Sequence, residues 1–275
     1  MNAKDDDGLS PPAPASVAIA VEHVADAATK QRAAALAEQL GLPLWTPDGG
    51  NDPELLLTVT ADRLALKARR GESAVVGGRP VSVDLGGIDT RSAAGASRKQ
   101  PLFRAVGLHR RHAPSDVTVA DLTAGFGEDA WMLARFGCRV LALERHPVVA
   151  AMLEDAVDRA AAAEPEVASR IEVMQRDSAL WLAAPPQTLP EVAYLDPMYP
   201  GPARRRAAQG KAMKLLRRLV GEDPDAYSLI DAALAVPIRR VVVKRPRLAP
   251  PLVADREPVA VIRGQRVRFD VYMAD

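Results

Sequence analysis

Residues 117–130 read VTVADLTAGFGEDA, and they carry the strongest local signal in the chain. A β-branched apolar run is followed by two glycines, Gly125 and Gly127, and then by the start of a helical pattern. This order is typical of a nucleotide-binding βα turn, because glycine lets the backbone approach a ligand closely. The stretch therefore predicts a ligand site at the carboxyl end of a parallel strand. A tight turn with a purely structural role is the alternative interpretation.

The sequence after this turn continues the alternation of short apolar runs with helical patterns. Such alternation is typical of right-handed βαβ units, which build a parallel sheet covered by helices on both faces. Two closing runs flank Gly264 without a helix between them, so they predict an antiparallel pair at the sheet edge. The predicted fold class is α/β, a Rossmann-like domain with a mostly parallel seven-stranded sheet. The predicted strands are 117–121, 139–143, 171–174, 192–195, 239–243, 260–262 and 267–272, and the predicted helices are 128–136, 147–162, 179–182, 207–220 and 226–235.

A small α+β domain is predicted ahead of this sheet. Residues 1–16 are acidic and then rich in proline and alanine, which predicts a disordered lead-in. Asp26 is placed to cap a helix and Gly41 to end it. We therefore expect a lead-in at 1–16, a small α+β domain at 17–90 and the main domain at 91–275. The predicted elements of the small domain are a strand at 17–21, a helix at 26–40, a hairpin of 55–60 with 64–68, and a strand at 81–85.

The composition bounds the class of protein. With 48% hydrophobic and 26% charged residues among 275, the chain has the make-up of a folded globular protein. Its single cysteine, Cys138, excludes an internal disulfide framework and a multi-cysteine zinc site, and we expect no bound metal. No apolar run approaches the ~20 residues that cross a bilayer, and the acidic, proline-rich start is unlike a signal peptide. We therefore expect a cytoplasmic protein without a membrane partner.

The net charge of +1 conceals a strong segregation of charge along the chain. Residues 1–60 carry a net charge of −6 and residues 112–197 carry −8, whereas residues 61–111 carry +7 and residues 198–275 carry +8. The two basic blocks predict a surface for a polyanion, since the arginine guanidinium can bind phosphate bidentately. Ordinary solvated arginines are the alternative interpretation. The candidates for nucleic-acid contact are Arg204, Arg205, Arg206, Lys211, Lys214, Arg217, Arg218, Lys244 and Arg245.

The first turn of the helix after the glycines is acidic. Glu128 and Asp129 stand where the pyrophosphate of a dinucleotide would bind, and Ala130 replaces the third glycine of the dinucleotide fingerprint. Two carboxylates repel phosphate but accept hydrogen bonds from a cationic ligand that bears an amino group. S-adenosylmethionine is such a ligand. A nicotinamide-dependent oxidoreductase is the alternative that uses the same turn.

Polar side chains also follow the next two predicted strands. Glu144 ends the second strand nineteen residues after Gly125, the spacing at which an acidic residue reaches ribose hydroxyls. The alternative is a surface carboxylate paired with Arg145. Asp177 and Ser178 follow the third strand, where their side chains either meet an adenine edge or cap a helix.

The segment after the fourth strand, residues 194–200, reads YLDPMYP. Asp196 is an acceptor for the N–H groups of an exocyclic amine, and Tyr199 offers an aromatic face for stacking. The two prolines stiffen the loop, and such stiffness suits a reaction that requires an amine to be held facing an electrophilic methyl group. A proline-rich turn with a core tyrosine is the alternative interpretation.

Asp-Pro-Met-Tyr at 196–199 resembles the Asp/Asn-Pro-Pro-Tyr/Phe signature of class I methyltransferases that act on exocyclic amino groups of bases. Met198 departs from the second proline of that signature. Further matches over about residues 80–273 resemble the RsmJ family of small-subunit ribosomal RNA (guanine-N2) methyltransferases. They are TAG at 123–125, GCRV at 137–140, LER at 143–145, PVVA at 147–150, YLDPMYP at 194–200, VVVKRP at 241–246, APPL at 249–252 and RFDVY at 268–272.

The resemblance implies a class I methyltransferase fold and transfer of a methyl group from S-adenosylmethionine to N2 of a guanine near the 3′ end of 16S rRNA. The implied partner is 16S rRNA or the small ribosomal subunit, and Asp196 and Tyr199 are the implied catalytic residues. Glu128 stands where relatives often have arginine, and Asp177 where serine is common. With the residues of the glycine turn, the predicted cofactor-binding set is Asp121, Gly125, Gly127, Glu128, Asp129, Glu144, Arg145, Asp177, Ser178 and Asp196.

Two alternatives to this function stay open at the level of sequence. One is a methyltransferase for another exocyclic amine of nucleic acid, such as the N6 of DNA adenine. No long target-recognition insertion separates the motifs, which makes DNA the less favoured substrate. The other is a non-catalytic RNA-binding assembly factor. The sequence leaves open the modified guanine, the state of the RNA substrate and the oligomeric state.

Overall fold

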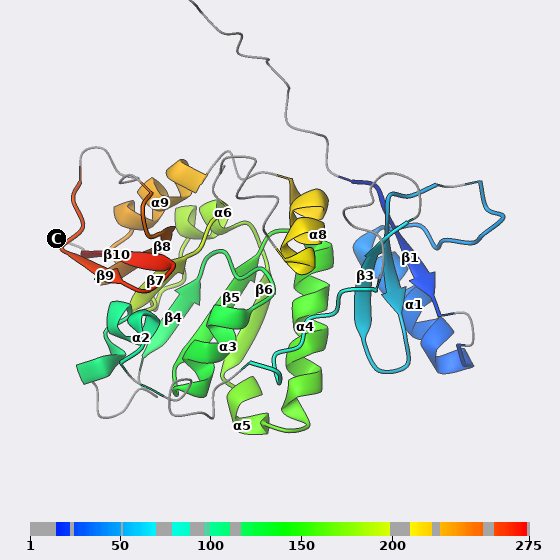
Figure 1. Ribbon diagram of the computed structural model, residues 1–275, viewed down its shortest axis with the longest axis horizontal. Coiled ribbons are helices and arrows are strands. Elements are labelled where there is room, and N and C mark those ends of the chain that lie inside the picture. The colour runs from blue at the N-terminus through cyan, green and yellow to red at the C-terminus, as the bar shows by residue number, and fades with distance from the viewer. Residues whose placement is uncertain are drawn as a thin grey trace, which may run out of the picture. The chain divides into compact units, whose positions relative to one another are not determined.

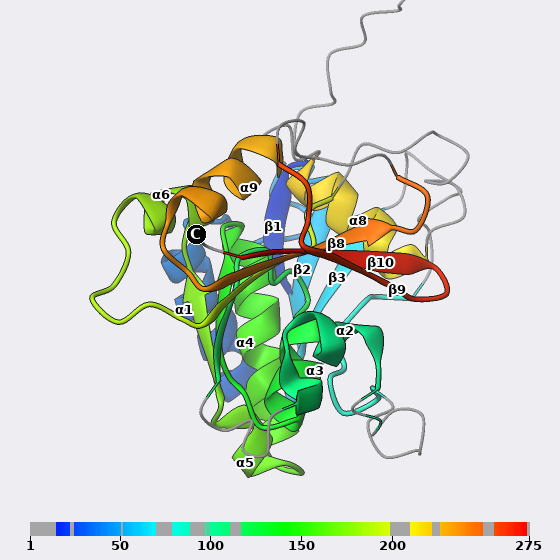
Figure 2. The same cartoon turned by 90° about the vertical axis from the view of Figure 1, so that its left-hand side faces the viewer.

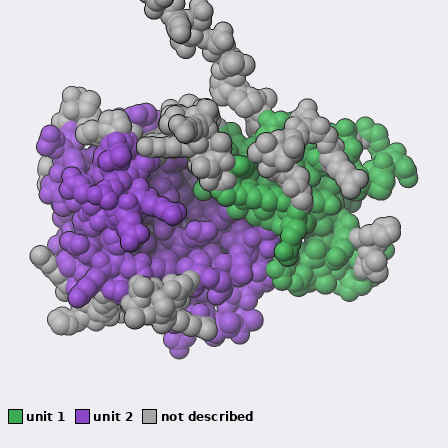
Figure 3. Space-filling view, viewed as in Figure 1, with its two compact units in different colours: residues 1–81, 199–223 green, residues 82–198, 224–275 purple. Residues whose placement is uncertain are grey.

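A computed structural model describes residues 15–22, 25–50, 52–69, 79–88, 97, 99–110, 117–198, 210–221, 226–249 and 256–273. The chain divides into two compact units (Figure 3). Unit 1 comprises Met1–Val81 and Tyr199–Asp223, and unit 2 comprises Ser82–Met198 and Pro224–Asp275. The single boundary predicted at residue 90 does not anticipate that the segment after the Asp196 loop joins unit 1. Most of the predicted lead-in at 1–16 lies outside the described residues.

Unit 1 has the predicted α+β character. Its three strands lie in the order β1-β2-β3, with β1 parallel to β2 and β2 antiparallel to β3. The Asp26 carboxylate accepts a hydrogen bond from the Thr29 N–H at 2.8 Å at the start of the helix, and Gly41 ends it in a left-handed conformation. The described elements of unit 1 are β1 (Val17–Val21), α1 (Ala27–Leu40), β2 (Leu55–Val59), β3 (Leu64–Ala68) and α8 (Lys211–Val220).

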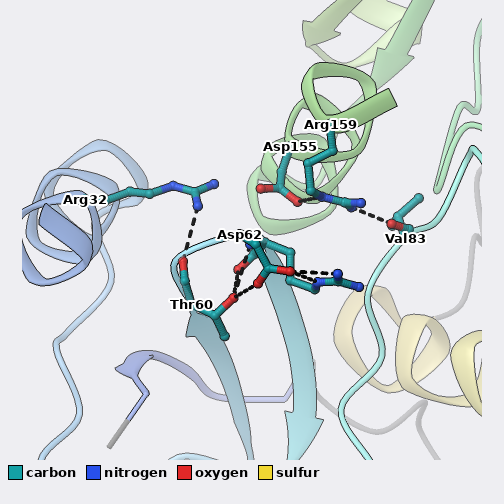
Figure 4. A network of polar contacts seen from close by, with 7 residues as sticks. Arg32, Thr60, Asp62, Val83, Asp155 and Arg159 are labelled. Carbon is teal, nitrogen blue, oxygen red and sulfur yellow. Dashed lines mark hydrogen bonds and ion pairs between the residues drawn. The ribbon is translucent and has the colours of Figure 1, made fainter. Parts of the chain in front are cut away.

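The hairpin turn of unit 1 is held by side chains (Figure 4). Asp62 accepts hydrogen bonds from the Thr60 hydroxyl and the Arg63 guanidinium, and Arg32 donates to the Thr60 carbonyl at 3.4 Å. The two ends of the turn are joined by the Thr60 N–H, which donates to the Arg63 carbonyl at 3.0 Å, and by the Arg63 N–H, which donates to the Thr60 hydroxyl oxygen at 3.1 Å. The predicted hairpin is therefore confirmed, with its second strand at Leu64–Ala68.

The strand predicted at 81–85 does not form. Val81 makes only an isolated bridge to Leu66, and the next residues belong to unit 2. There the Val83 carbonyl accepts a hydrogen bond from Arg159 at 2.5 Å, and Asp155 holds the same guanidinium at 2.9 Å (Figure 4). A side chain, not a neighbouring strand, therefore satisfies the Val83 carbonyl.

Unit 2 contains the α/β core, and its elements follow the predicted alternation. Short helices at 108–110 and 165–168 were not predicted, and the helix expected from residue 207 begins at Lys211, with 207–209 outside the described residues. The described elements are α2 (Pro101–Ala105), η1 (Leu108–Arg110), β4 (Thr118–Asp121), α3 (Glu128–Arg135), β5 (Arg139–Glu144), α4 (Pro147–Ala161), α5 (Pro165–Ala168), β6 (Ile171–Gln175), α6 (Ser178–Ala183), β7 (Val192–Leu195), α9 (Ala226–Ala235), β8 (Arg240–Pro246), β9 (Ala260–Arg263) and β10 (Val267–Met273).

The sheet of unit 2 has seven strands in the order β6-β5-β4-β7-β8-β10-β9. Strands β6 to β8 in this order are parallel, and β10 is antiparallel to both β8 and β9. Helices α3 and α4 cover one face and α6 and α9 the other (Figures 1 and 2). This confirms the predicted α/β class, the mostly parallel seven-stranded sheet and the antiparallel edge pair.

The central strand β7 and its neighbours anchor the loops that follow them. All four of its residues are buried, as expected for a parallel strand with helices on both faces. Neighbouring β4 is buried from Val119 to Asp121, and β8 from Val241 to Val243. The residues that follow these strands are therefore anchored to the best-packed part of unit 2.

The turn between β4 and α3 requires glycine at two positions. Gly125 and Gly127 have φ angles of +54° and +76°, a region that L side chains rarely adopt. A Cβ atom on Gly127 would also lie 2.3 Å from Cδ1 of Leu153. Conformation and packing therefore both exclude a side chain at this position.

We predict that Gly127→Ala lowers the free energy of unfolding by about 2 kcal/mol or more, through the left-handed strain and the displacement of Leu153. Urea titration measures this loss. Gly86→Ala is the matched control, because Gly86 has no positive φ and its added Cβ would lie at an ordinary 3.6 Å from Asp84. An equal loss in both variants would contradict the argument.

Candidate active site

The parallel strands bring their carboxyl ends to one edge of the sheet of unit 2. β4, β5, β7 and β8 are parallel neighbours in an unbroken run, so the loops that follow them meet there. Ligands of open α/β sheets bind at this edge. The candidate site residues described below come from the ends of these strands and of β6, from the loops that follow them, or from the first turn of α3.

Glu144 connects the end of β5 to the glycine turn. Its Oε2 accepts a hydrogen bond from the Gly125 N–H at 3.0 Å, and its Oε1 accepts one from the His146 N–H at 2.7 Å. The side chain is 9% exposed, so both bonds form in a largely desolvated environment. The carboxylate is therefore fixed beside Gly125, where the sequence predicts the ribose hydroxyls.

Asp121 ends β4 and lies below the turn. Its side chain is 2% exposed, and its Oδ1 accepts a hydrogen bond from the Thr123 N–H at 3.1 Å. Burial, together with the nearby Asp129 and Asp196 carboxylates, raises the pKa of Asp121 well above its usual range. The hydrogen bond from the Thr123 N–H therefore offsets only part of the cost of burying the ionised Asp121 carboxylate.

Asp177 and Ser178 both make structural contacts after β6. Asp177 accepts a hydrogen bond from the Leu180 N–H at 3.0 Å, which caps α6 as the sequence allowed. The buried Ser178 hydroxyl donates to the Leu122 carbonyl at 2.7 Å and so ties α6 to the glycine turn. A contact of either residue with an adenine edge stays a prediction.

The loop after β7 is tied directly to the glycine turn. The Asp196 N–H donates to the Thr123 hydroxyl oxygen at 2.6 Å, and 41% of the Asp196 side chain remains exposed. Tyr194, fully buried in β7, donates its hydroxyl to Oδ2 of Asp129 at 2.6 Å. The predicted stacking residue, Tyr199, lies outside the described residues.

Lys244 occupies the centre of the acidic cluster. Its ammonium lies 2.6 Å from Oδ2 of Asp129 and 2.8 Å from Oδ2 of Asp196. Burial lowers the pKa of Lys244, but the two carboxylates more than offset this and hold it above its usual range. The prediction that Lys244 contacts RNA phosphate is therefore wrong, because both its contacts are carboxylates. Arg245 is 4% exposed, so the same prediction is wrong for its buried side chain.

The basic helix predicted after this loop is α8, and it belongs to unit 1. Its buried face is formed by Leu215, Leu216 and Leu219. Lys211 donates to the Arg79 carbonyl and Arg218 pairs with Glu54, so two of the predicted phosphate-binding cations already have protein partners. The triplet at 204–206 lies outside the described residues.

The structure brings together most of the predicted site residues, although no ligand tests their roles. Glu128 and Arg145 are exposed at the rim of the same edge. Two contributors were not predicted as site residues, the Thr123 hydroxyl and the Tyr194 hydroxyl. Both residues lie within motifs noted in the sequence, at 123–125 and 194–200. The sequence does not show that they bond to Asp196 and Asp129. The residues joined by the hydrogen bonds and ion pairs above are Asp121, Thr123, Gly125, Asp129, Glu144, Tyr194, Asp196 and Lys244.

The described part of the chain carries neither a cluster of metal-ligating side chains nor a helix suited to crossing a membrane. No group of three or more His, Cys, Asp or Glu side chains is arranged there to hold a metal ion. No described helix combines the length and the apolar character that a membrane span requires. Cys138 is fully buried.

The donor set of this edge suits a cation. Four carboxylates gather near the glycine turn, those of Asp121, Asp129, Glu144 and Asp196, and Lys244 is paired with two of them. A dinucleotide pyrophosphate would meet unfavourable charge there, whereas a sulfonium ligand with an amino group would meet favourable charge. Fold and site together define a class I S-adenosylmethionine-dependent methyltransferase.

Comparisons with known proteins agree with this class. A family profile described as "Putative SAM-dependent methyltransferase" matches residues 35–274. The ribosomal RNA small subunit methyltransferase J of Thioalkalivibrio sulfidiphilus is 42% identical over 249 residues, 89% of this chain and 93% of the relative. That of Halorhodospira halophila is 41% identical over 248 residues, 87% of this chain and 88% of the relative.

A solved structure is similar along almost the whole chain. The crystal structure of a SAM-dependent methyltransferase from Neisseria gonorrhoeae has 31% sequence identity and a TM-score of 0.65, over 93% of this chain and 95% of that one. The chain belongs to the ribosomal RNA small subunit methyltransferase J family. This confirms the resemblance inferred from the motifs and sets aside the nicotinamide-dependent alternative.

We predict that Asp121→Asn stabilises the protein at neutral pH. The raised pKa of Asp121 means that the native state binds this proton more tightly than the unfolded state, so wild-type stability falls as pH rises through the acid range. The variant lacks that loss, and its advantage in unfolding free energy should grow from pH 4 to pH 7. Urea titration across pH measures it. The control is Asp231→Asn on the exposed surface of α9; the same pH dependence there would refute the argument.

We predict that Glu144→Gln raises the Kd for S-adenosylmethionine by roughly 10- to 100-fold, the range expected for losing a hydrogen bond to a charged group. The glutamine side chain has one acceptor oxygen and one NH2 group. It can therefore accept from only one of the Gly125 and His146 N–H groups, and its NH2 would face the other. Calorimetric titration measures the Kd. The exposed Glu172→Gln on β6 is the control, and unchanged affinity in both variants would remove Glu144 from the cofactor site.

Proposed function

We propose that this protein transfers a methyl group from S-adenosylmethionine to the exocyclic N2 of a guanine in small-subunit, 16S, ribosomal RNA. The observation that carries the proposal is the position of Asp196. Its partly exposed carboxylate stands at the tip of the central strand and is tied to the glycine turn through Thr123. A ligand over the turn and an amine at the tip would therefore lie next to each other. The names of the curated relatives supply the substrate class.

The cofactor supplies an activated methyl group on a positively charged sulfur. The chain supplies its orientation. Glu144, fixed by two backbone N–H groups, is placed to bind the ribose hydroxyls, and the backbone of the turn can approach the cofactor because Gly125 has no side chain. The surrounding carboxylates favour the positive charge of the donor.

Asp196 holds the target amine. A ring-conjugated amine is a weak nucleophile, so its nitrogen must face the methyl group while its N–H bonds are held by an acceptor. The Asp196 carboxylate and loop carbonyls accept those hydrogens. The nitrogen becomes acidic only after it has gained the methyl group, so proton loss follows transfer and requires no strong base. Tyr199 stacks on a guanine turned out of its helix in this proposal.

The RNA is bound through basic surface outside this acidic site. The two basic segments, residues 61–111 and 198–275, flank the acidic segment that forms the cofactor edge. Phosphate contacts position an RNA without reading its bases, which leaves discrimination of the base to the Asp196 loop. Because its substrate is ribosomal RNA, we place the protein in the cytoplasm.

We predict that Asp196→Ala lowers the rate of methyl transfer at least about 100-fold, the cost of removing one preorganised polar group from a reacting centre. The Kd for S-adenosylmethionine should change only a few-fold, because Asp196 acts on the amine. Transfer from labelled cofactor to 16S rRNA, both naked and in small subunits, measures the rate. Mass spectrometry of the nucleosides identifies the product. Asp231→Ala, at an exposed position of α9, is the control.

Three other outcomes of these experiments would each contradict one part of the proposed function. Full turnover by Asp196→Ala would refute the role of this carboxylate. A methylated adenosine in place of N2-methylguanosine would identify a different exocyclic amine. RNA binding by the wild-type protein with no methyl uptake from either substrate would identify a non-catalytic assembly factor.

A further inference from the structure

A chain of three short polar contacts links the interior of unit 2 to Asp196. Tyr194 donates its hydroxyl to Oδ2 of Asp129 at 2.6 Å, Lys244 donates to the same oxygen at 2.6 Å, and the Lys244 ammonium lies 2.8 Å from Oδ2 of Asp196. Tyr194 and Lys244 come from neighbouring strands and Asp129 from the first turn of α3.

The position of the Lys244 ammonium is determined from both ends. Its backbone lies opposite Phe269 within the pairing of β8 with β10, and its Nζ is anchored on Asp129. The Tyr194 hydroxyl orients that carboxylate in turn, and burial raises the pKa of Tyr194 well above its usual range, so the hydroxyl remains a donor. Lys244 is therefore presented to Asp196 as a fixed cation.

The two oxygens of Asp196 have different surroundings. Lys244 contacts Oδ2, whereas no hydrogen bond from the described residues reaches Oδ1. The side chain keeps 41% of its surface exposed, and its backbone N–H is held by Thr123. The lysine thus restricts rotation of the carboxylate and leaves one oxygen for an incoming N–H group.

We propose that Lys244 is a positioning residue for methyl transfer, which holds Oδ2 of Asp196 so that Oδ1 accepts an N–H of the target amine. The inference rests on the proposed function, since it assigns Asp196 to that amine. Lys244 itself contacts neither the cofactor nor the base in this proposal. It acts through the orientation and the ionised state of the carboxylate.

The ionised state matters because the charges around Asp196 are mostly negative. Asp129 and Glu128 face it from α3, Asp121 and Tyr194 from the ends of β4 and β7, and Lys244 from β8. Although 41% of the side chain is exposed, partial desolvation and the Asp129 and Glu128 carboxylates raise the pKa of Asp196 above its usual range. They favour the protonated acid, in which one oxygen would carry a proton and could not accept. The ammonium favours the anion. Removing Lys244 should therefore raise the pKa of Asp196.

A purely structural ion pair predicts a different result. If Lys244 served only to join β8 to α3, its removal would lower stability without moving the pH dependence of catalysis. The test therefore compares Lys244→Met, which keeps the length without the charge, with Lys244→Arg, which keeps the charge. Lys30→Met, on the exposed surface of α1, controls for the introduced methionine.

The kinetic experiment measures kcat and KM for S-adenosylmethionine between pH 5 and pH 9, with small-subunit RNA as the acceptor. We expect Lys244→Met to lower kcat about 100-fold, the scale of a misplaced reacting group, with KM within about threefold of wild type. The acidic limb of its kcat profile should move to higher pH. Lys244→Arg should recover most of that shift, and Lys30→Met should match wild type.

A second measurement does not depend on turnover. Carboxyl ¹³C NMR of aspartate-labelled protein follows the titration of Asp196, with the Asp196→Asn variant identifying its signal. We expect the signal to titrate at higher pH in Lys244→Met than in wild type or Lys244→Arg. The same titration in all three proteins would overturn the inference even if the wild type proved inactive on every RNA tested.

The two proposals can therefore fail separately. A wild type without methyl transfer, combined with the shifted Asp196 titration, refutes the proposed function and retains the coupling of Lys244 to Asp196. An active wild type with an unchanged kcat and acidic limb in Lys244→Met refutes the positioning role and retains the function. Thermal unfolding of each variant shows that the compared proteins are folded.

Discussion

The site depends on one hydrogen bond, from the Asp196 N–H to the Thr123 hydroxyl oxygen at 2.6 Å. It joins the loop after β4, which carries the glycine turn, to the loop after β7, which carries the Asp196 carboxylate that we propose holds the target amine. Pairing of the two strands ends at Asp121 opposite Tyr194, so the ladder alone does not order the residues beyond. Thr123 continues the connection past the end of the sheet, and its own N–H is held by Asp121. The distance between the glycine turn and the Asp196 loop is thereby set by side chains as well as by the sheet.

The acidic character of the edge follows from the same arrangement. Each carboxylate that is drawn into it would be costly to bury alone, and each has been given a donor: backbone N–H groups for Asp121 and Glu144, and Lys244 for Asp129 and Asp196. These donors reduce the cost without neutralising the site. A cation that binds there adds favourable interactions with charges that are already fixed. Burying these carboxylates lowers the stability of the fold and leaves an electrostatic field that is oriented before any ligand binds, as expected at a functional site.

The sequence predicted the periodic features well and the long-range contacts poorly. Alternating runs and paired glycines were sufficient for the sheet, the turn and the place of Asp196, because these follow from local pattern and from the topology of parallel strands. Lys244 was assigned to RNA because its position at a strand end was visible but its partner Asp129, 115 residues away, was not. The expectation that the segment after residue 198 belongs to the main domain has the same origin. The sequence shows that its leucines are apolar but not which part of the chain they pack against. At 81–85, a β-branched run predicted a strand, but a guanidinium satisfies the Val83 carbonyl instead.

The departure of Met198 from the family-like signature has a structural explanation. In an Asp-Pro-Pro-Tyr loop the second proline restricts the backbone directly before the aromatic residue. Here the loop is restricted earlier, because Asp196 is held at its N–H by Thr123 and Pro197 is buried. The backbone at Asp196 and Pro197 is thus held before residue 198, and Lys244 holds the Asp196 carboxylate from β8. A methionine at that position is therefore compatible with the orientation of Asp196 that the proposed function requires.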